Sequence, residues 1–144
     1  MKKTVILALL LLTLALLLTA CGGAAEESST GILNVQRDDE LITADIVFAD
    51  SCDNVSVVFH CDVDNDSFSG AAEYVYELGA VEPEQTYTVE ADATGNGWGY
   101  SGIFKNISSS SLSSGLNMPS LAEETIVITV LDGETELFST ESTR

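Results

Sequence analysis

Residues 55–63 constrain the fold of this chain more than any other stretch, because they alternate between apolar and polar positions. Every odd-numbered residue there is apolar, and three of the four even-numbered residues are polar. Successive side chains of a β-strand point to opposite faces, so this pattern predicts a strand with one buried face. The core-facing set would be Val55, Val57, Phe59, Cys61 and Val63.

Further segments carry the same two-residue period or are rich in β-branched and aromatic residues. Residues 41–49 place Ile42, Ala44, Ile46 and Phe48 on one face, and residues 86–93 place Tyr87, Val89, Ala91 and Ala93 inward. Weaker strand patterns cover residues 32–36, 72–78, 100–107, 125–131 and 134–140. Residues 50–54 form a turn cluster, Asp132-Gly133 predicts a type I′ hairpin, and residues 108–120 are a serine-rich loop. Seven or eight short strands without an amphipathic helix predict an all-β, immunoglobulin-like antiparallel β-sandwich.

The charge is strongly acidic, with 23 Asp and Glu against 5 Lys and Arg and a net charge of −18. Nucleic-acid binding depends on basic side chains that neutralise phosphates, so we expect no nucleic-acid partner. A hydrophobic fraction of 45% also excludes an acidic disordered tail as a description of the whole chain.

The N-terminal residues have the features of an export signal. Lys2 and Lys3 precede an apolar run over residues 5–18 that only Thr13 interrupts. As a helix this run would be about 21 Å long, which is short of the roughly 30 Å hydrocarbon core of a bilayer. The run ends in Leu18-Thr19-Ala20-Cys21. A signal-peptide core fits this length better than a transmembrane anchor does.

The sequence Leu18-Thr19-Ala20-Cys21 resembles the lipobox of bacterial lipoproteins. The resemblance implies cleavage after Ala20, a diacylglycerol thioether on Cys21, palmitate-type acylation, and anchoring in the cell membrane or outer membrane. The domain would then face the extracytoplasmic side, and the lipid anchor would make the membrane a partner. Two or three acyl chains hold a protein firmly, at about 0.8 kcal/mol per buried methylene. The alternatives are an ordinary cleaved signal with a chance cysteine and a retained transmembrane helix.

This interpretation divides the chain into a signal peptide at 1–20, a lipidated cysteine with a flexible tether at 21–31, and a β-sandwich domain at 32–144. Cleavage would remove two of the five basic residues and no acidic one. The mature chain would therefore carry 23 acidic side chains against Arg37, Lys105 and Arg144, with a net charge of −20.

Residues 81–91 carry a second resemblance. Their sequence, Val-Glu-Pro-Glu-Gln-Thr-Tyr-Thr-Val-Glu-Ala, is similar to a corner and strand of fibronectin type III and related immunoglobulin-like domains. The resemblance implies that the hydroxyl of Tyr87 bonds back onto the preceding corner. The chain departs from the pattern by lacking a tryptophan in its second strand and by having about 20 extra residues after the expected last strand.

The remaining cysteines and the single histidine do not predict a catalytic or zinc site. An extended strand would separate Cys52 and Cys61 by more than 20 Å, so we expect both thiols to be unpaired. Two thiols and His60 are too few ligands for zinc. His60 lies on the polar face of its strand and is expected at the surface. No nucleophile elbow or phosphate-binding loop occurs, so we expect no enzyme.

Residues 62–73 resemble the ligand spacing of a calcium loop. Asp62, Asp64 and Asp66 alternate, the Phe68 carbonyl follows, and Glu73 falls at the twelfth position. Ser67 replaces the glycine expected at position six, and strands flank the loop. The alternatives are a calcium site and a solvated acidic turn.

The Gly-rich segment 95–100 contains Trp98 and Tyr100, which could contact a glycan or a partner protein. In the alternative, Trp98 folds back over one end of the sandwich as a plug.

Taken together, these patterns predict a cell-envelope lipoprotein whose β-sandwich is an extracytoplasmic binding or structural module, with an unidentified protein or glycan as partner. A calcium-binding or calcium-stabilised surface domain and a small envelope enzyme are the alternatives.

Overall fold

The computed structural model describes residues 29–105 and 118–144. The predicted signal peptide, the lipidation site at Cys21, most of the tether and most of the serine-rich loop lie outside the described residues. The described part contains eight strands: β1 (Gly31–Arg37), β2 (Leu41–Val47), β3 (Cys52–Asp64), β4 (Phe68–Val81), β5 (Thr86–Asp92), β6 (Gly99–Phe104), β7 (Ile126–Asp132) and β8 (Thr135–Ser142).

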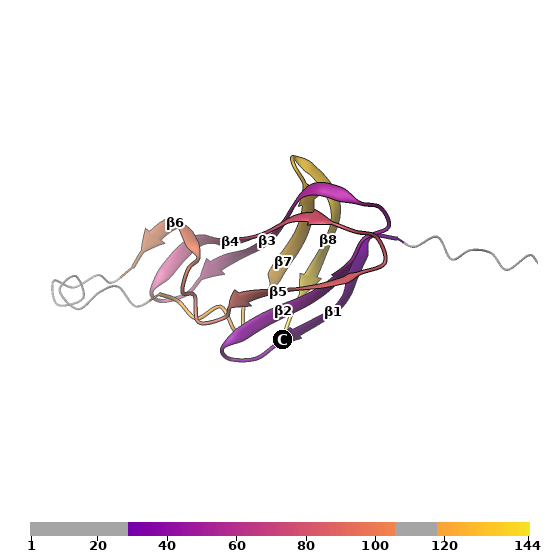
Figure 1. Ribbon diagram of the computed structural model, residues 1–144. Helices are drawn as coiled ribbons and strands as arrows, with labels where there is room; N and C mark the ends of the chain where they lie inside the picture. The colour runs from indigo at the N-terminus through magenta and orange to yellow at the C-terminus, as the bar shows by residue number, and fades with distance from the viewer. Residues whose placement is uncertain (1–28, 106–117) are drawn as a thin grey trace, which may run out of the picture.

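The strands form two antiparallel sheets packed face to face, as the sequence predicts (Figure 1). The smaller sheet has the order β1-β2-β5, and the larger has the order β6-β4-β3-β7-β8. The pairings of β2 with β5 and of β3 with β7 correspond to the B–E and C–F neighbours of an immunoglobulin-like sandwich. Strands β4 and β6 extend the larger sheet beyond β3 on its other side.

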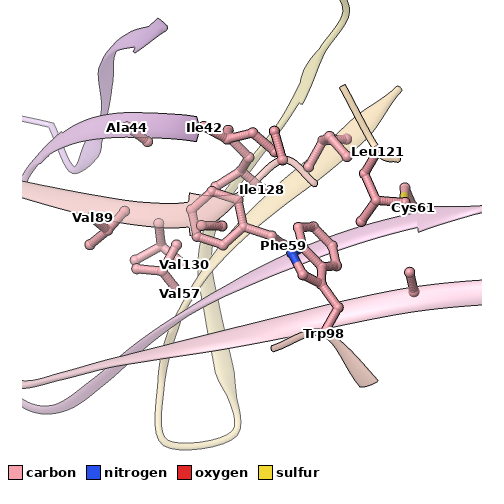
Figure 2. Close-up of a cluster of buried hydrophobic side chains, with 14 of the residues drawn as sticks. Ile42, Ala44, Val57, Phe59, Cys61, Val89, Trp98, Leu121, Ile128 and Val130 are labelled. Atoms are coloured by element: carbon pink, nitrogen blue, oxygen red, sulfur yellow. The ribbon is translucent and has the colours of Figure 1, made fainter. Parts of the chain in front are cut away.

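The core lies between the two sheets and contains the side chains that alternation places inward. All five predicted residues of β3 are buried, and so are Ile42, Ala44, Ile46 and Phe48. Figure 2 shows Phe59 at the centre of this cluster, with Trp98 beside it and Ile128 from β7 nearby. Each fully buried aliphatic or aromatic side chain contributes about 1.5–3 kcal/mol through removal from water, so this interface dominates the stability of the fold.

Two local predictions need correction. Residues 52–54 belong to β3 rather than to the preceding turn, and the register of β3 with β4 is irregular between Cys52 and Val55. The β7–β8 hairpin forms, but its two loop residues are Gly133 and Glu134, because Asp132 pairs with Thr135. Only Gly133 has a positive φ, 59°, so the turn is not type I′, which needs positive φ at both positions.

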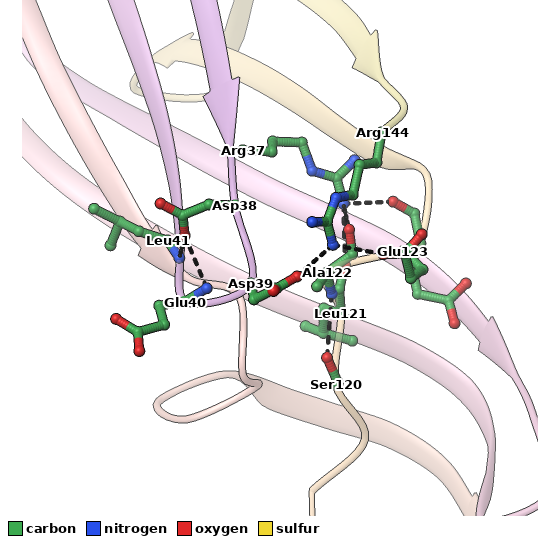
Figure 3. A network of polar contacts seen from close by, with 11 residues as sticks. Arg37, Asp38, Asp39, Glu40, Leu41, Ser120, Leu121, Ala122, Glu123 and Arg144 are labelled. Carbon is green, nitrogen blue, oxygen red and sulfur yellow. Dashed lines mark hydrogen bonds and ion pairs between the residues drawn. The ribbon is translucent and has the colours of Figure 1, made fainter.

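Arg37 joins the end of the smaller sheet to the C-terminal part of the chain (Figure 3). Its Nη1 donates to the Ser142 carbonyl at 2.7 Å, in β8. Its Nη2 donates to three carbonyls of the segment before β7, those of Leu121, Ala122 and Glu124. A rigid guanidinium fork suits several carbonyls at once, so Arg37 ties β1 to β8 and to this segment.

Tyr87 forms the corner bond that the resemblance implies. Its hydroxyl accepts a hydrogen bond of 2.7 Å from the backbone N–H of Glu82, and its ring packs edge-on against Phe48 at 5.7 Å. In immunoglobulin domains this corner opens strand F of the other sheet, whereas here it opens β5 of the three-stranded sheet. The corner is therefore present, but at the start of a strand that corresponds to strand E rather than to strand F of an immunoglobulin domain.

Candidate functional site

An open groove of about 650 Å³ lies at the junction of β3, β4 and β6. The strand register builds it, because Glu73 of β4 pairs with His60 on one side and with Gly99 on the other. Gly99 has no side chain, so the surface beside Glu73 stays open. The lining residues are His60, Ala71, Glu73, Tyr74, Val75, Gly97, Gly99, Tyr100 and Ser101.

The segment between β5 and β6 forms one wall of the groove and is fixed by several hydrogen bonds. The Thr94 N–H donates to the Asp92 carboxylate at 2.7 Å, and the Tyr100 hydroxyl donates to the Gly95 carbonyl at 2.9 Å. Gly95 has φ of 90°, and a Cβ there would lie 2.4 Å from the Tyr100 hydroxyl oxygen. Only glycine fits this position, and the hydrogen bonds to Asp92 and Gly95 hold the wall in this conformation.

His60 of β3 and Glu73 of β4 line the groove side by side, and the exposed Asp62 carboxylate lies next to His60. The His60 Nδ1 lies 3.7 Å from the Glu73 carboxylate, and the His60 Nε2 lies 3.7 Å from the Asp62 carboxylate. Both distances exceed hydrogen-bond length, and the His60 side chain is 40% exposed. The Glu73 carboxylate can attract a cation from solvent, while Ala71 and Val75 offer an apolar floor.

Burial raises the pKa of two groups near the groove, Cys61 and Tyr100. Removal from water raises the pKa of the Cys61 thiol to about 11, because Cys61 lies in the core. Burial also raises the pKa of the Tyr100 phenol. In the opposite direction, the Thr94 hydroxyl donates to the Asp92 carboxylate and lowers its pKa. Because its pKa is raised to about 11, the Cys61 thiol stays protonated at neutral pH and is a poor nucleophile.

The five residues of the predicted calcium loop are not brought together. Residues 62–73 form the tight β3–β4 hairpin, in which Asp64 pairs with Ser69 and Glu73 pairs with His60. Glu73 thus lies about 13 Å along the strands from Asp64. The Phe68 carbonyl accepts the Asn65 N–H at 2.9 Å, and Lys105 Nζ contacts the Asp64 carboxylate at 2.7 Å.

The hairpin does not gather enough ligands for a metal ion. Among residues 29–105 and 118–144, no group of three or more His, Cys, Asp or Glu side chains is placed to hold one. Asp66 lies in the turn of the hairpin and is exposed, as are Asp62 and Asp64. The geometry is that of an acidic hairpin with its own lysine counterion.

Trp98 and Tyr100 are structural residues: Tyr100 lines the groove, and Trp98 lies behind its wall, packed on Tyr74. Trp98 is only 6% exposed, its Nε1 donates to the Asp92 carbonyl at 2.8 Å, and its ring packs against Phe59 and Tyr74. Tyr100 packs edge-on against Phe68 at 5.5 Å. Trp98 therefore folds back as a plug, the alternative to a ring presented to a ligand.

The cysteine prediction is confirmed for the described residues. Cys52 and Cys61 are both free thiols, and both lie on the same strand, β3. Cys52 lies at the edge of the core and is partly buried, whereas Cys61 is fully buried.

Sequence reasoning missed the groove itself. His60 lies at the surface as predicted, with a side chain that is 40% exposed, but its pairing with Glu73, which the sequence placed in a calcium loop, was not predicted. The alternation of Glu73, Val75 and Glu77 along β4 was a visible signal of an outward face. The pairing of β4 with β6 could not be read from local pattern, because the two strands lie about 30 residues apart in the chain.

Within the described residues there is no helix with the length and hydrophobicity that a membrane span requires. No protein-family model matches the chain, and neither the curated proteins nor the solved structures contain a significant match to it.

Proposed function

We propose that this protein is a bacterial cell-envelope lipoprotein that displays a rigid β-sandwich as an extracytoplasmic binding module. The observation that carries the proposal is Cys21 directly after Leu18-Thr19-Ala20, at the end of a short apolar run with a basic start. The low-complexity segment between Cys21 and β1 is long enough to hold the sandwich away from the lipid surface.

The character of the sandwich supports a binding rather than a membrane-contacting role. Its surface is strongly acidic, and anionic lipid headgroups would repel it. The groove at β3, β4 and β6 has fixed walls, so a ligand would not have to order them on binding. The partner would be an extracytoplasmic protein or glycan.

Lipidation of Cys21 is tested by expressing the full chain in a bacterium supplied with radiolabelled palmitate. The wild type should incorporate label and partition into the detergent phase of a Triton X-114 separation. Cys21→Ser should lose both properties, whereas the matched control Cys52→Ser should keep them. Partition of the wild type and Cys21→Ser into the aqueous phase would indicate an ordinary cleaved signal. Partition of both into detergent would indicate a retained transmembrane helix, and either result contradicts the proposal.

A further inference from the structure

The outward face of the five-stranded sheet has a defined composition, which follows from strand alternation and register. We call it the outer face; its residues are Ser56, Val58, His60, Asp62 and Asp64 of β3, Ser69, Ala71, Glu73, Val75 and Glu77 of β4, Gly99, Ser101 and Ile103 of β6, Val127, Thr129 and Leu131 of β7, and Glu136, Ser139 and Glu141 of β8. Cross-strand pairs such as Val58–Val75 and Val58–Thr129 form its centre, and Val75 is 45% exposed. Carboxylates surround this apolar centre.

Carboxylates dominate the charge of the outer face, which carries those of Asp62, Asp64, Glu73, Glu77, Glu136 and Glu141. Lys105 pairs with Asp64 at the hairpin end of this face. His60 lies 3.7 Å from both Asp62 and Glu73 and adds positive charge only when it is protonated.

The three lysine and arginine side chains of the described segments are engaged away from Glu73 and Glu77. Arg37 binds backbone carbonyls, Lys105 pairs with Asp64 at the hairpin end, and Arg144 contacts Asp39 and Glu123. Around Val75 the outer face therefore has no lysine or arginine of the described residues to neutralise it, and this part would repel both a second copy of itself and an anionic lipid surface.

Along β4 the outer face has a regular spacing. Glu73, Val75 and Glu77 occupy alternate positions of one strand, so each step is about 6.6 Å. An extended peptide with the pattern Lys-x-apolar-x-Lys has the same repeat. Its two cations could face Glu73 and Glu77 while its apolar side chain covers Val75.

The groove adds a seat for one cationic side chain at the end of this row. Glu73 lines it together with Ala71 and Val75. A lysine or arginine could lay its aliphatic stem on the alanine and valine and bring its charge to the Glu73 carboxylate.

From these observations we infer that the outer face binds an extended basic segment of a partner protein, with one lysine or arginine seated in the groove against Glu73. This inference rests on the binding role proposed above and names the chemistry of the partner. It does not depend on Cys21, so loss of lipidation in the partition experiment would leave peptide binding unchanged.

The test uses the full chain purified in a nonionic detergent and a fluorescein-labelled peptide with the repeat Lys-Thr-Val-Thr-Lys. Binding is measured by fluorescence anisotropy at low and at physiological ionic strength. Glu73→Gln combined with Glu77→Gln should weaken binding about five- to tenfold, because two exposed ion pairs are lost. The matched control, Glu84→Gln with Glu90→Gln, removes the same charge from the exposed surface of the β4–β5 turn and β5, and should change the affinity less than about twofold.

Three results would overturn the inference. These are absence of binding, equal weakening in both double variants, and equal binding of a scrambled peptide in which all lysines are adjacent. The last two would show only general attraction between opposite charges. Backbone amide shifts on peptide addition should centre on Glu73, Val75 and Val58, and shifts centred on the three-stranded sheet would likewise contradict it. Thermal unfolding of each variant checks that its fold is retained.

Discussion

Gly70 and Gly102 lie directly opposite each other in the β4–β6 ladder, with the Phe68 ring over both of them. A Cβ built on Gly102 would lie 2.3 Å from the Ser69 carbonyl oxygen and 2.6 Å from the Gly70 Cα. Both atoms belong to the backbone, so neither can rotate away from the added Cβ. This close approach holds β6 against β4 and thereby sets one side of the groove.

Gly102→Ala should consequently destabilise the domain by about 1–3 kcal/mol, the usual cost of forcing an extra methyl group into a packed site. Gly31→Ala is the matched control, because a Cβ there would meet no atom within 4 Å. Urea denaturation of both variants measures the free energy of unfolding. Equal stability of Gly102→Ala and the wild type would mean that β6 does not pack on β4 as described.

The Tyr87 corner gives a second prediction. Tyr87→Phe keeps the ring on Phe48 but removes the oxygen that accepts the Glu82 N–H. We expect a loss of about 1 kcal/mol, the typical net value of a hydrogen bond. Tyr76→Phe is the control, because the Tyr76 hydroxyl forms no hydrogen bond to any described residue. Thermal unfolding with calorimetry measures both, and an equal effect of the two changes would contradict a special role of the corner.

Trp98 is the single tryptophan of the chain, so its fluorescence reports the core directly behind the groove wall. A ring that is 6% exposed and packed on Phe59 should emit at shorter wavelength than free tryptophan and resist quenching by acrylamide. Unfolding in urea should shift the emission to longer wavelength. Native emission resembling that of free tryptophan would contradict the plug and favour a ring exposed for binding.

The core faces of β2 and β3 were predictable from sequence, because alternation is a local property of the strand. The turn of the β7–β8 hairpin was misplaced by one residue, because Asp132 can end a strand as well as begin a turn. The Arg37 contacts and the Glu73–His60 pair depend on register between segments far apart in the chain. A single sequence carries no local signal for such pairings, so the groove and the Arg37 contacts could not be predicted without the structure.

Cys61 makes the stability depend on pH in the alkaline range. Its pKa is about 11 in the folded protein, compared with an ordinary value of 9.0. Because the folded-state value is the higher one, the contribution to stability is complete below pH 9 and is lost as pH rises toward 11. The difference corresponds to roughly 2–3 kcal/mol.

Cys61→Ala removes this titrating group, so its stability should fall less than that of the wild type between pH 9 and 11. Urea midpoints of the two proteins across this range measure the difference. Other groups titrate there as well, but they are shared by both proteins and cancel in the comparison. Parallel pH profiles for the wild type and Cys61→Ala would show that the thiol is not buried as described.

Calcium gives the last prediction. The Phe68 carbonyl already accepts the Asn65 N–H, the Lys105 ammonium contacts Asp64 and lowers its pKa, and Glu73 lies beside His60. These groups do not surround a common point, so calcium should act on the domain only as a divalent counterion to its negative charge. The thermal midpoint should therefore rise equally in millimolar calcium and magnesium.

The decisive comparison is between two charge-matched variants, Asp62→Asn with Asp64→Asn and Glu84→Gln with Glu90→Gln. Screening depends on total charge, so both variants should show the same small reduction in the calcium effect. A specific site would instead make the rise larger in calcium than in magnesium, because a calcium cage of six to eight oxygens discriminates against the smaller ion. The additional rise in calcium would also be lost only in the Asp62→Asn, Asp64→Asn variant. These two results together would establish a calcium loop that forms by rearrangement of the β3–β4 hairpin.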